Sequence, residues 1–133
     1  MSTSMKENLP VVQKYFASLN ETRLDDLGTV FAEEATLRFP TYEPIRGRAA
    51  IQSFYTAVLK HYPKHFDNPV KFFFSDDGSV AVEIHFEGET VKGQTIVFDA
   101  VDVFEVENGR VKNLRIRYDS AKVAKMLDEF EPR

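Results

Sequence analysis

The chain has 133 residues, which suits one domain of ordinary size and leaves no room for a second. Hydrophobic residues make up 43% of it, enough to bury a core and to exclude a disordered chain. The formal net charge is −4, and 17 basic and 21 acidic residues are mixed along the chain, so we expect neither nucleic acid nor membrane as a partner. The absence of cysteine excludes disulfides and thiolate metal sites. Residues 1–133 are therefore treated as a single domain.

The amino-terminal segment from Met1 to Leu9 lacks the apolar run of a signal peptide. No stretch of the sequence reaches the roughly 18 apolar residues that a membrane-spanning helix needs. We expect a soluble, cytoplasmic protein.

The first half of the chain carries three helical patterns and one strand. Helices are predicted over 8–20, 22–31 and 48–62. The first and third show apolar residues at helical spacing: Val12, Tyr15, Phe16 and Leu19, then Ile51, Phe54, Tyr55 and Val58. Alternation from Ala35 to Phe39 predicts a strand that Pro40 ends, with Phe39 facing inward.

The second half reads as sheet. Strands are predicted over 70–74, 80–87, 94–107 and 110–118, followed by a helix over 120–130. This order permits an α+β fold in which the three helices pack in a strongly curved antiparallel sheet and leave a cone-shaped pocket.

One carboxylate interrupts the apolar face of the long strand over 94–107. Asp102 stands between Ala100 and Phe104, which share its face. Burial penalises an ionised carboxylate, so the acid should have a raised pKa and act as a hydrogen-bond donor. Asp102 is thus the first candidate functional residue.

The opposite face of the same strand is also apolar, because it carries Val97, Val101 and Val103. A chain with few helices cannot cover both faces of its sheet. We therefore expect a homodimer in which this outer face meets a second copy.

Three segments carry a resemblance to a known family: VVQKYFASLN at the start, FAEEATLRFPTYEPIRGRAAIQSFYTAVLK in the middle and VFDAVDVFEVENGRVKNLRIRYD near the end. They resemble bacterial Δ5-3-ketosteroid isomerase, of the nuclear-transport-factor-2-like (NTF2-like, or SnoaL-like) superfamily. The resemblance implies the cone-shaped NTF2-like fold for almost the whole chain.

The resemblance also implies roles for particular residues. Tyr15 matches the tyrosine, and Asp102 the protonated acid, that donate hydrogen bonds to the enolate oxygen of the steroid in that family. Tyr55 matches a further tyrosine that supports the first. These three residues are the expected catalytic group.

The general base of that family lies directly before a proline in the early strand, where this sequence has Phe39. Phenylalanine cannot accept a proton, and a general base contributes about 10² to 10⁴ in rate. Isomerase chemistry is therefore in question, and Glu43 is the nearby substitute base. Epoxide hydrolases of the superfamily place an arginine two residues before the strand aspartate, where this chain has Ala100, so that reaction is set aside.

Three functions follow as alternatives. The chain is a ketosteroid isomerase-like enzyme or SnoaL-like cyclase or dehydratase with a different base, a non-catalytic module that binds a steroid-like or polyketide-like molecule by a carbonyl or phenol oxygen, or a dimeric interaction protein. No cofactor is expected, nor a metal, because Pro63 separates His61 from His65. The expected ligand-binding residues are Phe39, Phe54, Val58, Ile84, Phe86, Ala100, Leu114, Ile116 and Tyr118.

Overall fold

The computed structural model describes the backbone of residues 3–128 and the side chains of residues 8–127. Its elements in chain order are α1 (Thr3–Asn20), α2 (Leu24–Val30), β1 (Phe31–Arg38), β2 (Ile45–Arg46), α3 (Arg48–His61), β3 (Lys64–Phe74), β4 (Val80–Glu89), β5 (Thr95–Glu107), β6 (Arg110–Tyr118) and α4 (Ser120–Asp128). The helices of the first half and the strands of the second confirm the α+β prediction. The last two residues of the helix predicted over 120–130 lie outside the described residues. No helix in the described part of the chain is both long and apolar enough to span a membrane.

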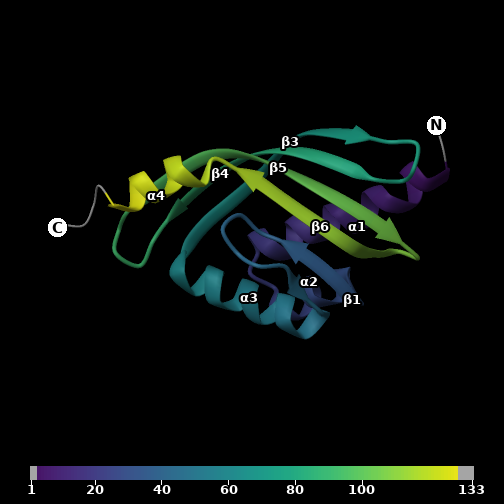
Figure 1. Cartoon of the computed structure of the whole chain (residues 1–133), viewed down its shortest axis with the longest axis horizontal. Coiled ribbons are helices and arrows are strands. Elements are labelled where there is room, and N and C mark those ends of the chain that lie inside the picture. The colour runs from purple at the N-terminus through teal and green to yellow at the C-terminus, as the bar shows by residue number, and fades with distance from the viewer. Residues whose placement is uncertain (1–2, 129–133) are drawn as a thin grey trace.

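Six strands form one curled sheet in the order β2-β1-β6-β5-β4-β3. Figure 1 shows the long strands β3 to β6 arching over the helices, with α4 at one end of the arch. The pair of β1 and β6 is parallel, so the sheet is mixed where an antiparallel sheet was expected. The reason lies in the connections. Short turns join β3 to β6 in series and force antiparallel pairing, whereas α3 and β3 to β5 separate β1 from β6 and leave their relative direction free.

The core lies between α1, α2, α3 and the concave face of the sheet. Its fully buried side chains include Val12 and Tyr15 of α1, Leu37 of β1, Ile51 of α3 and Phe104 of β5. These are the residues that the helical and strand periodicities turn inward. Burial of each such side chain contributes about 1.5 to 3 kcal/mol, which fixes the helices against the sheet.

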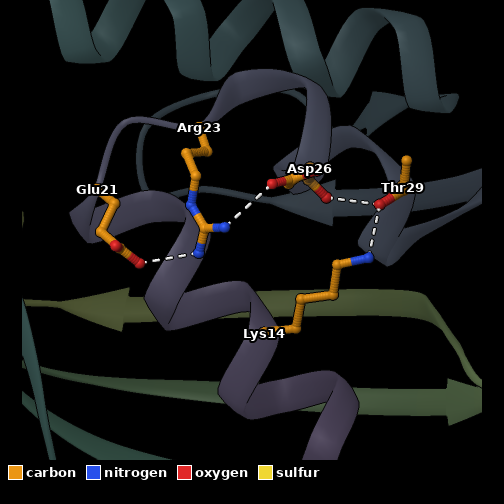
Figure 2. Close-up of polar contacts among 5 residues, drawn as sticks. All are labelled: Lys14, Glu21, Arg23, Asp26 and Thr29. Carbon is orange, nitrogen blue, oxygen red and sulfur yellow. Dashed lines mark hydrogen bonds and ion pairs between the residues drawn. The ribbon is translucent and has the colours of Figure 1, made fainter.

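Exposed polar contacts connect α1 to α2, as Figure 2 shows. Arg23 donates to Glu21 at 2.8 Å and to Asp26 at 3.2 Å, and Lys14 donates to Thr29 at 2.9 Å. The Thr29 hydroxyl donates in turn to the backbone oxygen of Asp26 at 2.7 Å. Exposed ion pairs contribute at most about 1 kcal/mol each, so this network adjusts the turn between helices that the core already holds.

Strand β3 begins at Lys64, six residues before the strand predicted from Val70. Pro69 lies inside this segment, and proline cannot donate a hydrogen bond to a ladder. In the structure β3 is the edge strand of the sheet, and its register shifts between Pro69 and Lys71. An edge strand with a bulge accommodates proline. This extension of β3 brings Asp67 onto the sheet.

Candidate functional site

A cavity of about 520 Å³ lies between α1, α3, α4 and the concave face of the sheet. Tyr15, Tyr55 and Asp102 all line it, so the structure brings the three expected catalytic residues into one space. Expected ligand-binding residues that also line the cavity are Phe39, Phe54, Val58, Ile84, Phe86, Ala100, Ile116 and Tyr118.

Leu114 does not belong to this wall, which corrects the expectation for it. It is fully buried and pairs with Phe104, one side-chain layer beyond the pair of Asp102 and Ile116. The ring of Phe104 packs against the ring of Tyr15, with their centroids 5.1 Å apart, and closes the cavity at that layer. Leu114 is therefore part of the core.

Tyr15 from α1 and Tyr55 from α3 meet through their hydroxyl groups, whose oxygens lie 2.6 Å apart. Both side chains are buried, and burial raises the pKa of each well above 10. Both therefore keep their protons at neutral pH. A pair of hydroxyls uses one proton for the bond between them, so the second O–H stays available as a donor to a third oxygen.

Asp102 projects from β5 between Val82 of β4 and Ile116 of β6. Its side chain is 3% exposed, and no described residue makes a hydrogen bond to its carboxyl group. Burial raises its pKa well above 3.8, and the nearby charge of Asp67 raises it further. The raised pKa favours the protonated carboxyl group, the form that can donate a hydrogen bond into the cavity.

A second carboxylate, Asp67, lines the same cavity, and the sequence reasoning missed it. It stands on β3 opposite Phe86 of β4, so its side chain shares the concave face. Burial raises its pKa to about 6, and the neighbouring His65 lowers it. Asp67 is thus mostly ionised at neutral pH, and its charge raises the pKa of Asp102.

Two side chains fix the position of Asp67. Asn20, the last residue of α1, donates to the backbone oxygen of Asp67 at 2.9 Å and accepts from its backbone N–H at 2.8 Å. The ring nitrogens of His65 lie 3.0 Å from the backbone oxygens of Tyr62 and Leu19. These contacts hold the His65 ring between the ends of α1 and α3.

Hydrophobic periodicity could not have found Asp67, because the pattern is inverted there. Phe66 is 50% exposed on the outer face, while His65 and Asp67 turn toward the cavity. The available signal was the alternation itself, which puts the polar residues His65 and Asp67 on one side of a strand that begins at Lys64. The prediction that the strand begins at Val70 concealed it.

Aromatic rings form much of the remaining wall. Phe39 contacts Phe54 and Tyr118, with ring centroids 4.9 and 5.7 Å away, and so lines the cavity as its inward direction predicts. Glu43, the substitute base considered from the sequence, is exposed and is not among the lining residues. Tyr62 and Phe98 add further rings that the sequence did not single out.

No cluster of three or more His, Asp or Glu side chains suited to a metal ion occurs within the described side chains. The site offers instead two proton donors, one ionised carboxylate and an apolar aromatic wall. This set can bind an oxygen of an otherwise apolar molecule, polarise it and exchange a proton with it.

The chain matches a known domain family and resembles several solved structures. The model of the SnoaL-like domain matches residues 12–114. Similar solved structures include a candidate polyketide cyclase from Xanthomonas campestris pv. campestris, with a TM-score of 0.86 and 21% identity over 93% of this chain and 99% of that one. A candidate SnoaL-like polyketide cyclase from Jannaschia sp. CCS1 has a TM-score of 0.87 and 16% identity over 99% of this chain and 98% of that one.

A third structure, a protein with a ketosteroid isomerase-like fold from Catenulispora acidiphila in complex with trimethylamine, has a TM-score of 0.82 and 15% identity over 94% of this chain and 99% of that one. At these identities the solved structures show a shared fold. The family model spans most of the chain. The chain therefore belongs to the SnoaL-like domain family.

Proposed function

We propose that this protein binds a small, largely apolar molecule in its cavity and holds a carbonyl or phenol oxygen of that molecule at Asp102 and the Tyr15–Tyr55 pair. The observation that carries the proposal is the Asp102 carboxyl group, which lies in the cavity wall, is 3% exposed and makes no hydrogen bond to a described residue, while burial raises its pKa well above 3.8. Loss of the donor of a buried hydrogen bond costs about 1 to 3 kcal/mol, so a ligand oxygen bonded to this carboxyl group would depend on it measurably.

The cavity wall favours a flat, fused-ring ligand of steroid-like or polyketide-like type. Aromatic rings surround the space, and Phe39 contacts both Phe54 and Tyr118 edge to face. Ring edges and faces of this kind pack well against a planar apolar skeleton. The polyketide cyclase names among the similar structures support the polyketide-like class.

Three uses of this pocket differ in chemistry. Binding alone needs the donors, isomerisation of the ketosteroid isomerase type needs a proton acceptor as well, and a SnoaL-like cyclase or dehydratase reaction needs an acceptor at its own position. Phe39 removes the acceptor of the isomerase pattern. Binding of an oxygen-bearing apolar molecule is common to all three.

The first prediction tests this binding with 2-naphthol, a two-ring phenol whose fluorescence reports its environment. The Asp102→Ala variant should bind it more weakly by about 1 to 3 kcal/mol, or roughly 5- to 150-fold, because the donor is lost. Asp102→Asn keeps an N–H donor and should stay within a few-fold of the parent. Titration of each variant by fluorescence measures the difference.

Asp99→Asn is the matched control, because the Asp99 side chain is 86% exposed on the opposite face of β5. It should bind as the parent does. Equal affinities for the parent and Asp102→Ala would refute the proposed role of Asp102.

A further inference from the structure

We propose that Asp67 is the proton acceptor of a catalytic site, and that it removes a proton from the carbon next to a carbonyl group held at Asp102 and the tyrosine pair. The proposal rests on the function proposed above and extends it from binding to proton transfer. It assigns the missing acceptor to β3, far along the chain from Phe39.

The position of Asp67 in the cavity suits a proton acceptor. Asp67 lines the cavity from one edge of the concave face, and Asp102 lines it from β5 two strands away. A molecule lying across the cavity can therefore offer its oxygen to Asp102 and an adjacent carbon to Asp67. The two carboxyl groups are close enough for the charge of Asp67 to raise the pKa of Asp102.

The backbone of Asp67 is fixed in place before any ligand binds. Both backbone polar groups of Asp67 are bonded to the Asn20 side chain, so its Cα is held at the end of α1. No described residue donates a hydrogen bond to its carboxylate, which leaves the oxygens free to accept a proton. A carboxylate held in place without donors is a stronger base than a hydrogen-bonded one.

The ionisation of the two carboxyl groups also suits these roles. The pKa of Asp67 lies at about 6, whereas that of Asp102 lies well above 3.8 and is raised by the ionised Asp67 itself. Because the charge of Asp67 raises the pKa of Asp102, Asp67 ionises first, which suits Asp67 as the base and Asp102 as the hydrogen-bond donor. A base with a pKa near 6 is mostly ionised at pH 7 and still binds a proton appreciably.

Other groups on or near the wall fit this role less well. Glu43 is exposed and does not line the cavity, and the side chain of Asp99 lies on the opposite face of the sheet. Both ring nitrogens of His65 face backbone carbonyl oxygens, so neither lone pair points to a substrate. His61 lines the cavity from the exposed end of α3, and the experiment below tests it directly.

The step balances without a cofactor. The C–H bond next to the carbonyl breaks, its proton forms an O–H bond on Asp67, and its electron pair forms an enolate. The enolate oxygen accepts hydrogen bonds from Asp102 and from the free O–H of the Tyr15–Tyr55 pair. Return of the proton to the same or a conjugated carbon regenerates the Asp67 carboxylate, with no net oxidation.

The second prediction uses 2-tetralone, a two-ring ketone, in D₂O. The parent should accelerate exchange of its α-protons for deuterium, followed by NMR. Asp67→Asn should lower the protein-catalysed rate by about 10² to 10⁴, because an amide does not accept the proton. Its affinity for 2-naphthol should stay within a few-fold of the parent, since the oxygen site is unchanged. Glu43→Gln, as the control outside the cavity wall, should exchange as the parent does. His61→Gln tests the competing acceptor and should retain the exchange that Asp67→Asn loses.

The pH dependence gives a second readout. In the parent the exchange rate should rise as Asp67 ionises, through a pKa of about 6, and then level. The other titratable groups of the wall are Tyr15, Tyr42, Tyr55, His61, Tyr62, His65, Asp102 and Tyr118. The His61→Gln variant keeps all these groups except the His61 ring, so its exchange rate should show the same dependence on pH.

Three results would overturn the assignment of Asp67: a parent that does not exceed background exchange, an Asp67→Asn variant that exchanges as fast as the parent, or a loss of exchange in His61→Gln. Failure of the binding proposal looks different, because 2-naphthol affinity then stays unchanged in Asp102→Ala whatever the Asp67 variants do.

Discussion

Asp67 carries a cost in the folded protein that its surroundings only partly offset. Burial in the cavity wall disfavours its charge, and the His65 ring is the neighbour that favours it. The ring of His65 is itself held by the carbonyl oxygens of Leu19 and Tyr62, at the C-terminal ends of α1 and α3. A charge kept in such a place despite its cost is typical of a functional residue.

The third prediction follows from this cost. The pKa of Asp67 is about 6 in the folded protein and near 3.8 when unfolded, so its ionisation opposes folding above pH 6 and has no effect below about pH 4. Asp67→Asn should therefore stabilise the protein at pH 7.5 and not at pH 4. The full shift corresponds to about 3 kcal/mol, and solvent reaching the half-buried side chain reduces this to about 1 to 2 kcal/mol.

Urea unfolding of parent and variant at the two pH values measures this difference. Asp76→Asn, in the exposed turn between β3 and β4, serves as the control for loss of a carboxylate. An equal gain at both pH values would show that the charge of Asp67 is not the cause.

At the scale of elements, the contact between the end of α1 and β3 decides where the acid lies. Asn20 bonds to the backbone of Asp67 much as a neighbouring strand would, and it does so on the free edge of the sheet. Edge strands leave unpaired N–H and C=O groups, and here a helix end supplies their partners. The geometry of the site thus depends on a contact between residues 47 positions apart in the chain.

The fourth prediction concerns this contact. Asn20→Ala removes both hydrogen bonds and should lower the free energy of unfolding by about 1 to 3 kcal/mol. Hydrogen exchange of the Asp67 amide should accelerate, because its acceptor is lost. Asn68→Ala is the matched control, since Asn68 is exposed on the same strand. If the Asp67 amide exchanges as slowly in Asn20→Ala as in the parent, the Asn20 side chain does not hold the backbone of Asp67.

Some helices and strands could be predicted from the sequence and others could not. Helices α1 and α3 carry clean apolar faces, and the hairpins around Gly78 and Gly109 mark β4, β5 and β6, so all of these were predicted. The start of β3 was not, because Pro69 and an exposed Phe66 contradict the usual strand pattern. The partner of β1 was not predicted either, since pairing between distant segments leaves no local signal.

For the molecule as a whole, the arched sheet explains how residues from distant segments converge. Its concave face joins Tyr15 and Tyr55 from the helices with Asp67 and Asp102 from strands β3 and β5. Buried aromatic and acidic residues on predicted inner faces were within reach of sequence reasoning, whereas a polar residue on an edge strand was not. Asp67, the proposed proton acceptor, could therefore be identified only from the structure.

The convex face of the sheet remains apolar in places. Val97 and Val101 are 36% and 38% exposed on β5, as the alternation predicts. The strand register aligns Phe73, Ala81 and Val103 in one row across β3, β4 and β5, and Phe73 is 43% exposed. A contiguous apolar row of this kind on a sheet face is typical of an interface.

The fifth prediction is that two copies pair through this convex face. Sedimentation at micromolar concentration should give twice the mass of the chain, because association removes the exposed valines and Phe73 from water. Val101→Lys should shift the equilibrium toward monomer, since a buried charge without a partner opposes the contact. Val91→Lys is the matched control, because Val91 is 62% exposed in the turn between β4 and β5. A parent chain that sediments as a monomer at these concentrations would refute the pairing, and the cavity on the concave face would then have to act within one copy.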